Sequence, residues 1–70
     1  MAIKEVWDSC NKEQHRELQA AVMADGVGAT AAWKYLSGRQ VPLKLYQESI
    51  REHVKRILGL DLTVEELFKF

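Results

Sequence analysis

The sequence predicts an all-α domain of four to five short helices. No stretch alternates apolar and polar residues beyond a few positions, and Val, Ile and Thr are not clustered as they are in strands. Three of the four glycines, Gly26, Gly38 and Gly59, stand where apolar helical periodicity stops, which is where glycine commonly ends a helix. With 70 residues the chain has room for one hydrophobic core, so residues 1–70 are expected to form a single domain.

The first two helices follow from apolar spacing and from one capping box. Ile3–Ser9 carries apolar residues at helical spacing. Asn11 followed by Gln14 is the pattern of a capping box, in which each side chain accepts a hydrogen bond from the other residue's backbone. A helix is therefore expected from there to about Ala24. Its core stripe consists of Leu18, Ala21 and Val22.

The next two helices are bounded by glycine and proline. Gly26-Val27-Gly28 breaks the preceding helix, and a short helix over Ala29–Ser37 is stopped by Gly38. Pro42 suits the first turn of a long helix, Pro42–Leu58, because that turn does not use its missing N–H. Glu52 is placed to pair with Arg56 one turn later. The apolar face of this long helix comprises Leu43, Tyr46, Ile50, Val54, Ile57 and Leu58.

A short last helix is predicted over Val64–Phe68. Thr63 and Glu66 form a second capping box, and Leu62 with Leu67 has the spacing of a hydrophobic staple.

Composition excludes several classes of protein. One cysteine, Cys10, allows no internal disulfide, and two histidines with it are too scattered for a structural zinc site, so no metal or cofactor is expected. The longest apolar run is five residues, which is too short for a membrane span, and the N-terminus lacks the pattern of a secretory signal. A cytoplasmic protein that does not enter membranes is expected.

The charges are balanced in total but unevenly distributed. Residues 1–26 carry three basic and five acidic side chains, residues 27–59 six and two, and residues 60–70 one and three. The central segment is therefore a basic island between acidic ends. Zero net charge alone argues against strong nucleic-acid binding, whereas a local island favours it.

No pattern of catalytic residues is evident. His15 and His53 have no obvious partner in the sequence, Cys10 has no neighbouring base, and the carboxylates are spread along solvent-facing positions. Gly26-Val27-Gly28 lacks the third glycine and the preceding strand of a phosphate-binding loop. The protein is expected not to be an enzyme.

The segment from Glu17 to Gly38 meets the outline requirements of a helix-turn-helix over a core of about residues 12–59. Such a unit needs a supporting helix, a tight turn with a residue of positive φ, and a second helix that fits the major groove. Gly26 supplies the turn and Val27 an apolar residue after it. Across the helix crossing, the expected facing residues are Ala21, Val22, Ala32 and Tyr35.

This stretch resembles helix-turn-helix regulators of the Cro/lambda-repressor type, and more closely the small prophage or mobile-element proteins of Bacteroidetes-type bacteria. The matching residues are Gly26-Val27, Tyr35, Gly38, and Pro42-Leu43 through Gln47. The chain departs from that pattern at Gly28, where Ser or Thr is usual, at Ala32, where a larger apolar residue is usual, and at Tyr35, where tryptophan is usual.

The resemblance implies a lambda-repressor-like fold in which helix 29–37 enters the major groove of double-stranded DNA. Thr30 would meet a phosphate or a thymine methyl group, and Lys34 a phosphate or a guanine edge. Arg39, Gln40 and Lys44 would lie near the DNA backbone. The full set implied to face DNA is Gly28, Ala29, Thr30, Trp33, Lys34, Ser37, Arg39, Gln40 and Lys44.

Trp33 admits two interpretations. Tryptophan is usually mostly buried, and Trp33 shares a stripe with Ala29 and Leu36, so it can pack in the core. Alternatively it faces DNA or a partner subunit. A buried Trp33 would rotate the helix and change which side chains are presented.

The functional expectation is a small DNA-binding transcriptional regulator that acts as a homodimer, because a single short helix gives little specificity and two-fold pairing doubles the contact. The alternative is a helical protein-interaction module, an adaptor or antirepressor, that does not bind DNA. The apolar residues near the C-terminal end either serve this pairing or close the core; they are Leu60, Leu62, Leu67, Phe68 and Phe70.

Overall fold

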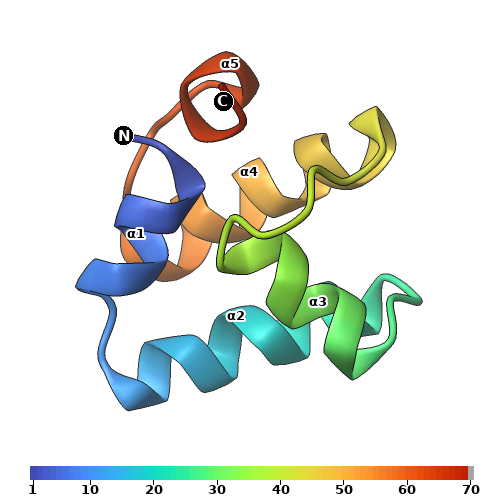
Figure 1. Cartoon of the computed structure of the whole chain (residues 1–70). Coiled ribbons are helices and arrows are strands. Elements are labelled where there is room, and N and C mark those ends of the chain that lie inside the picture. The colour runs from blue at the N-terminus through green and yellow to red at the C-terminus, as the bar shows by residue number, and fades with distance from the viewer. Residues whose placement is uncertain (70) are drawn as a thin grey trace.

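The computed structural model describes residues 1–69 and contains five α-helices, with no strand among those residues. The helices are α1 (Ile3–Ser9), α2 (Lys12–Ala24), α3 (Ala29–Leu36), α4 (Lys44–Leu58) and α5 (Val64–Leu67). Figure 1 shows α2 and α4 as the two long helices, with α3 near both of them. The helices α1 and α5 both lie close to the N-terminus of the chain. The all-helical prediction is confirmed.

Both predicted capping boxes are present. Asn11 Oδ1 accepts the backbone N–H of Gln14 at 2.8 Å, and Gln14 Oε1 accepts the N–H of Asn11 at 2.9 Å. Thr63 and Glu66 exchange the corresponding hydrogen bonds at 3.1 Å. These contacts fix the starts of α2 and α5 because they satisfy N–H groups that have no partner inside the helix.

Glycines reverse the chain after three of the helices, as expected. Gly26, Gly38 and Gly59 have φ angles of 96°, 80° and 72°, a region that L-residues with a Cβ rarely adopt. Gly59 is the left-handed cap that ends α4.

The start of α4 differs from the prediction by two residues. The helix begins at Lys44, and Leu43 is its N-cap residue in an extended conformation, with ψ of 153°. Pro42 therefore precedes the cap instead of forming the first turn. As a consequence Leu43 is 73% exposed and does not belong to the apolar face of the helix.

Two other helix ends and one ion pair also differ from expectation. Ser37 is the C-cap of α3 and Phe68 the C-cap of α5, so each helix is one residue shorter than predicted. Glu52 pairs with Arg51 at 3.1 Å and not with Arg56.

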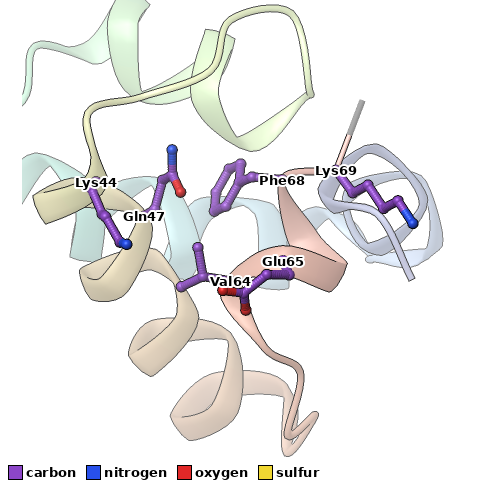
Figure 2. A pocket seen from close by; sticks show the side chains of 6 residues that line it. All are labelled: Lys44, Gln47, Val64, Glu65, Phe68 and Lys69. Carbon is purple, nitrogen blue, oxygen red and sulfur yellow. The ribbon is translucent and has the colours of Figure 1, made fainter.

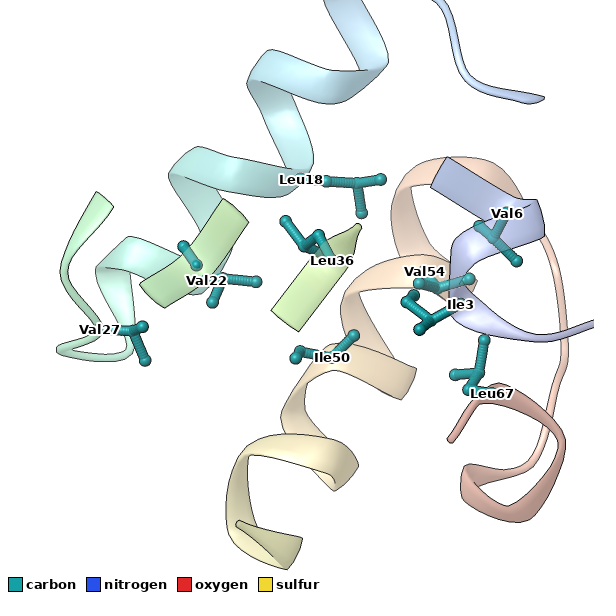
Figure 3. Close-up of a cluster of buried hydrophobic side chains, with 10 residues drawn as sticks. Ile3, Val6, Leu18, Val22, Val27, Leu36, Ile50, Val54 and Leu67 are labelled. Carbon is teal, nitrogen blue, oxygen red and sulfur yellow. The ribbon is translucent and has the colours of Figure 1, made fainter. Parts of the chain in front are cut away.

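The core is built by all four of the helices α1 to α4 and closed by α5. In Figure 3 Leu36 lies between Leu18 of α2 and Ile50 of α4, while Ile3, Val54 and Leu67 gather at the other end. Packing of α2 against α3 and α4 supplies the largest part of the interhelical contact. The buried cluster consists of Ile3, Val6, Leu18, Val22, Val27, Ala32, Leu36, Ile50, Val54 and Leu67.

The apolar residues near the C-terminal end close this core. Leu67 is fully buried, and Leu60, Leu62 and Phe68 are partly buried against the cluster, so they offer little free surface for pairing. Phe70 lies outside the described residues. Within residues 1–69 no helix has the length and apolar character needed to cross a membrane.

Candidate nucleic-acid interface

The four residues Asp25–Gly28 connect α2 to α3, and the two helices pack against each other directly. Val22 of α2 and Ala32 of α3 are completely buried, and Val27 in the connection is 8% exposed. The Gln19 side-chain amide of α2 donates to the Ala29 carbonyl at 3.2 Å. Small and β-branched residues therefore let α3 lie close to α2, which holds the opposite face of α3 toward solvent.

Eight of the nine residues implied to face DNA are exposed. They are Gly28, Ala29, Thr30, Trp33, Lys34, Arg39, Gln40 and Lys44. Ser37 is the exception: it is 4% exposed, and its hydroxyl donates to the Trp33 carbonyl at 2.6 Å. Its position at the end of α3, where the helix turns inward onto the core, removes it from the candidate interface.

Trp33 lies outside the buried core cluster, so it is partly buried at the border of the core and does not pack within it. Its side chain is 37% exposed, and the guanidinium of Arg39 lies over the indole ring, with Cζ 4.3 Å from the ring centroid. This is a cation–π arrangement, in which the ring's negative face attracts the cation. The pair forms a flat surface that is both apolar and positively charged.

The end of α3 explains how Arg39 reaches Trp33. After Ser37, Gly38 adopts its positive φ and the chain folds back, so that the backbone N–H groups of Arg39 and Gln40 both donate to the Lys34 carbonyl, at 2.9 and 3.2 Å. Bonds of this kind satisfy carbonyls at a helix end that would otherwise lack donors. They also place the Arg39 side chain beside the last turns of α3.

The basic island of the sequence divides into two groups in three dimensions. Arg51 contacts Glu52, Asp61 and the Leu62 carbonyl, and Lys55 lies 4.0 Å from Asp61. These cations, with Arg56, serve contacts within and around α4.

The second group consists of Lys34, Arg39 and Lys44, which form no ion pair with any residue in 1–69. Residues 26–47 contain these three cations and no acidic residue. The positive surface is thus concentrated on α3 and the segment that follows it.

Lys44 occupies a different environment from the other two. It borders an open hollow of about 520 Å³ between α4 and α5 (Figure 2), where the Phe68 ring faces Gln47 and Val64. Glu65 lies on the same rim. The rim, with Lys44, Lys69 and Glu65, carries charges of both signs, which makes this hollow unlike the surface around Trp33.

His53 belongs to a polar cluster that the sequence did not predict. Its Nε2 lies 2.9 Å from Asp25 Oδ2 in the α2–α3 connection, and Arg56 donates to its Nδ1 at 3.0 Å. Since Nδ1 accepts from Arg56, Nε2 carries the proton and donates to Asp25. Ser49 lies 3.3 Å from the same Nε2, and its hydroxyl also donates to Asp25.

This cluster does not have the geometry of a catalytic relay. In such a relay the carboxylate and the hydroxyl bind opposite nitrogens of the imidazole ring. Here Asp25 and Ser49 are both at Nε2, and Arg56 occupies Nδ1. The cluster instead ties the turn that leads into α3 to the middle of α4.

His15 also has a partner. Its ring stacks on Trp7 with a centroid separation of 3.9 Å, and Nε2 lies 2.6 Å from the Trp7 carbonyl. Cys10, nearby, has its thiol against the Val6 carbonyl at 3.1 Å, and burial raises the pKa of that thiol. These residues join α1 to α2 and contribute nothing to the surface around Trp33.

The Asp25 cluster predicts a specific acid sensitivity. Hydrogen bonds from Ser49 and then His53 lower the pKa of Asp25 below its ordinary value. A carboxyl whose pKa is lower in the folded chain stabilises the fold at pH above its unfolded pKa, and this stabilisation is lost as pH falls through the folded pKa. Asp25→Asn should therefore unfold more easily than wild type near neutral pH and show a shallower loss of stability below about pH 4.

Urea unfolding at a series of pH values measures this difference, with Glu13→Gln as a control on an exposed face. An acid profile of Asp25→Asn that parallels wild type would contradict the described hydrogen bonds. Glu66 contributes equally to the acid sensitivity of wild type and of each variant, because hydrogen bonds from Thr63 also lower the pKa of its carboxyl.

No protein-family model matches this sequence, and comparisons with curated proteins and with solved structures likewise find no match.

Proposed function

We propose that the protein is a small DNA-binding regulator of helix-turn-helix type, in which α2 supports α3 and α3 enters the major groove of double-stranded DNA. The observation that carries the proposal is the surface of α3, where Trp33 and Arg39 stack beside Lys34 on a segment without acidic residues. Phosphate neutralisation by Lys and Arg supplies most of the non-specific affinity of such proteins. Transcriptional regulation is the role that this class of binding commonly serves.

The dimensions of α3 support the same proposal. It has eight residues, and its N-cap Gly28 and first two residues, Ala29 and Thr30, are all exposed and all small. Side chains of this size let a helix N-terminus approach base edges closely, while Lys34 and Arg39 lie further along, where phosphates flank the groove. Gln40 stands next to Arg39 and adds a neutral donor for the backbone.

Tryptophan fluorescence tests the proposal. The chain has two tryptophans, so Trp7→Phe leaves Trp33 as the single reporter on α3. Titration with random-sequence duplex DNA at low and at moderate salt should change its emission, with an affinity that falls steeply as salt rises. No change at either salt, together with no gel shift of wild-type protein on the same DNA, would overturn the proposal.

A protein-interaction module without DNA binding is the second candidate, and one observation favours it. Leu43 and Leu45 are 73% and 74% exposed, and side chains of this kind gather at protein interfaces. The module would leave Trp33 emission unchanged by DNA at any salt, which is the result that the leading proposal excludes.

A further inference from the structure

We infer that the N-terminal end of α4 is the surface through which two copies of this chain pair. This inference gives the interface of the dimeric form expected for the proposed regulator, but it does not depend on contacts with DNA. Val41, Leu43 and Leu45 are between 50% and 74% exposed, although they lie within five residues of one another. In Figure 1 this yellow end of α4 projects at the edge of the molecule, on the side opposite α1.

The surface is unusual because most other large apolar side chains in residues 1–69 pack on the core, the C-terminal leucines and Phe68 among them. In the same range the other large apolar residues with substantial exposure are Met1, Met23 and Trp33. Leu43 and Leu45 flank the first residue of α4, and both leucine side chains are largely exposed. Covering one such leucine should tighten pairing by about tenfold to a hundredfold.

Charge complementarity identifies a second copy as the occupant. A two-fold interface uses the same patch on both chains. To pair through ions, the patch must therefore carry a positive charge on one side of its centre and a negative charge on the other. Lys44 and Glu48 are exposed, lie one turn apart beside Leu45, and form no ion pair with each other or with other residues in 1–69. Antiparallel pairing of two α4 helices brings Lys44 of each copy opposite Glu48 of the other, with the leucines between them.

The area available for such a pair is small, because a stable interface buries about 800 Å² on each partner. The leucine patch alone is smaller than this, so the dimer is expected to dissociate in the micromolar range and to gain from binding two adjacent half-sites on DNA. Lys44 is thereby assigned to pairing and not to a phosphate.

Leu43→Ser should weaken pairing but stabilise the fold, so a loss of pairing cannot be mistaken for a loss of folding. Leu43 is the N-cap of α4 and provides no capping hydrogen bond, whereas serine is a preferred N-cap. The variant should raise the thermal midpoint of the dilute monomer by about 4–8 °C. Sedimentation equilibrium without DNA should show its dimer dissociation constant increased by at least about tenfold.

A control variant and two charge reversals, made singly and together, complete the test. Met23→Ser, which alters a 42% exposed methionine on α2, should leave the dissociation constant unchanged. Lys44→Glu and Glu48→Lys should each weaken pairing, and the double variant should restore it. A wild-type chain that stays monomeric at millimolar concentration, or a Leu43→Ser chain that pairs as wild type does, would overturn the inference. The DNA titration above is read at dilute protein, so either proposal can fail without the other.

Discussion

Gly38→Ala is expected to lower the thermal midpoint of unfolding by roughly 10–20 °C, from a loss of roughly 2–4 kcal/mol in a domain of this size. Two costs add at this position. A residue with a Cβ pays about 1–2 kcal/mol to adopt a left-handed conformation, and Gly38 has a φ of 80°. The added Cβ would also lie 3.0 Å from Lys4 Cβ and 3.5 Å from Lys4 Cα, so α1 would have to move off the end of α3.

Gly28→Ser is the matched control, measured by the same thermal unfolding. Gly28 has a φ of −66°, nothing lies within 4 Å of an added Cβ, and it is the N-cap of α3. Serine there should stabilise the fold by a few tenths to about 1 kcal/mol. If Gly38→Ala melted at the wild-type temperature, the chain reversal after α3 and its contact with α1 would be wrong as described.

Lys34→Ala combined with Arg39→Ala is expected to lower the affinity for random duplex DNA about a hundredfold at fixed low salt, roughly tenfold for each lost charge-assisted contact. Each cation that neutralises a phosphate contributes about 0.9 to the slope of log affinity against log salt. The double variant should therefore reduce the magnitude of this slope by about two. Fluorescence anisotropy of labelled duplex at several salt concentrations measures both quantities.

Two controls distinguish position and geometry from charge. Lys12→Ala combined with Lys55→Ala removes the same net charge from residues away from α3 and should change the slope little. Arg39→Lys retains the charge but not the planar group stacked on Trp33, so it should keep the slope and lose part of the affinity. Equal losses from both double variants would show that DNA senses only net charge, which would contradict the assigned orientation of α3.

The helix ends could be predicted from sequence because their causes are local. Asn11 with Gln14, and Thr63 with Glu66, act over three residues, and the positive φ of Gly26 and Gly59 needs only the absence of a Cβ. The predicted start of α4 is two residues too early for an equally local reason. Proline restricts its own φ to a value suited both to the first helical turn and to the extended segment before a cap, so Pro42 does not distinguish the two.

The contacts that define the candidate site could not be predicted because they join distant residues. Asp25 and His53 are 28 positions apart, and their hydrogen bond depends on how α2 packs on α4. Helical spacing placed Trp33 at the border between the core and solvent and left both interpretations open. The cation over its ring, Arg39, lies beyond the helix end and is positioned by the backbone bonds to Lys34. The division of the basic island likewise appears only once Asp61 is seen beside Arg51 and Lys55.

The helices α3 and α4 begin without a side-chain cap, at Gly28 and Leu43, whereas Asn11 and Thr63 cap α2 and α5. Uncapped first turns open more often, so their amide hydrogens should exchange with solvent sooner than those of the capped helices. One of these turns belongs to the surface proposed for DNA and the other to the surface proposed for a second copy. Adding DNA should therefore slow exchange at the first turn of α3, and raising the protein concentration should slow it at the first turn of α4. Each turn reports whether its own surface is occupied.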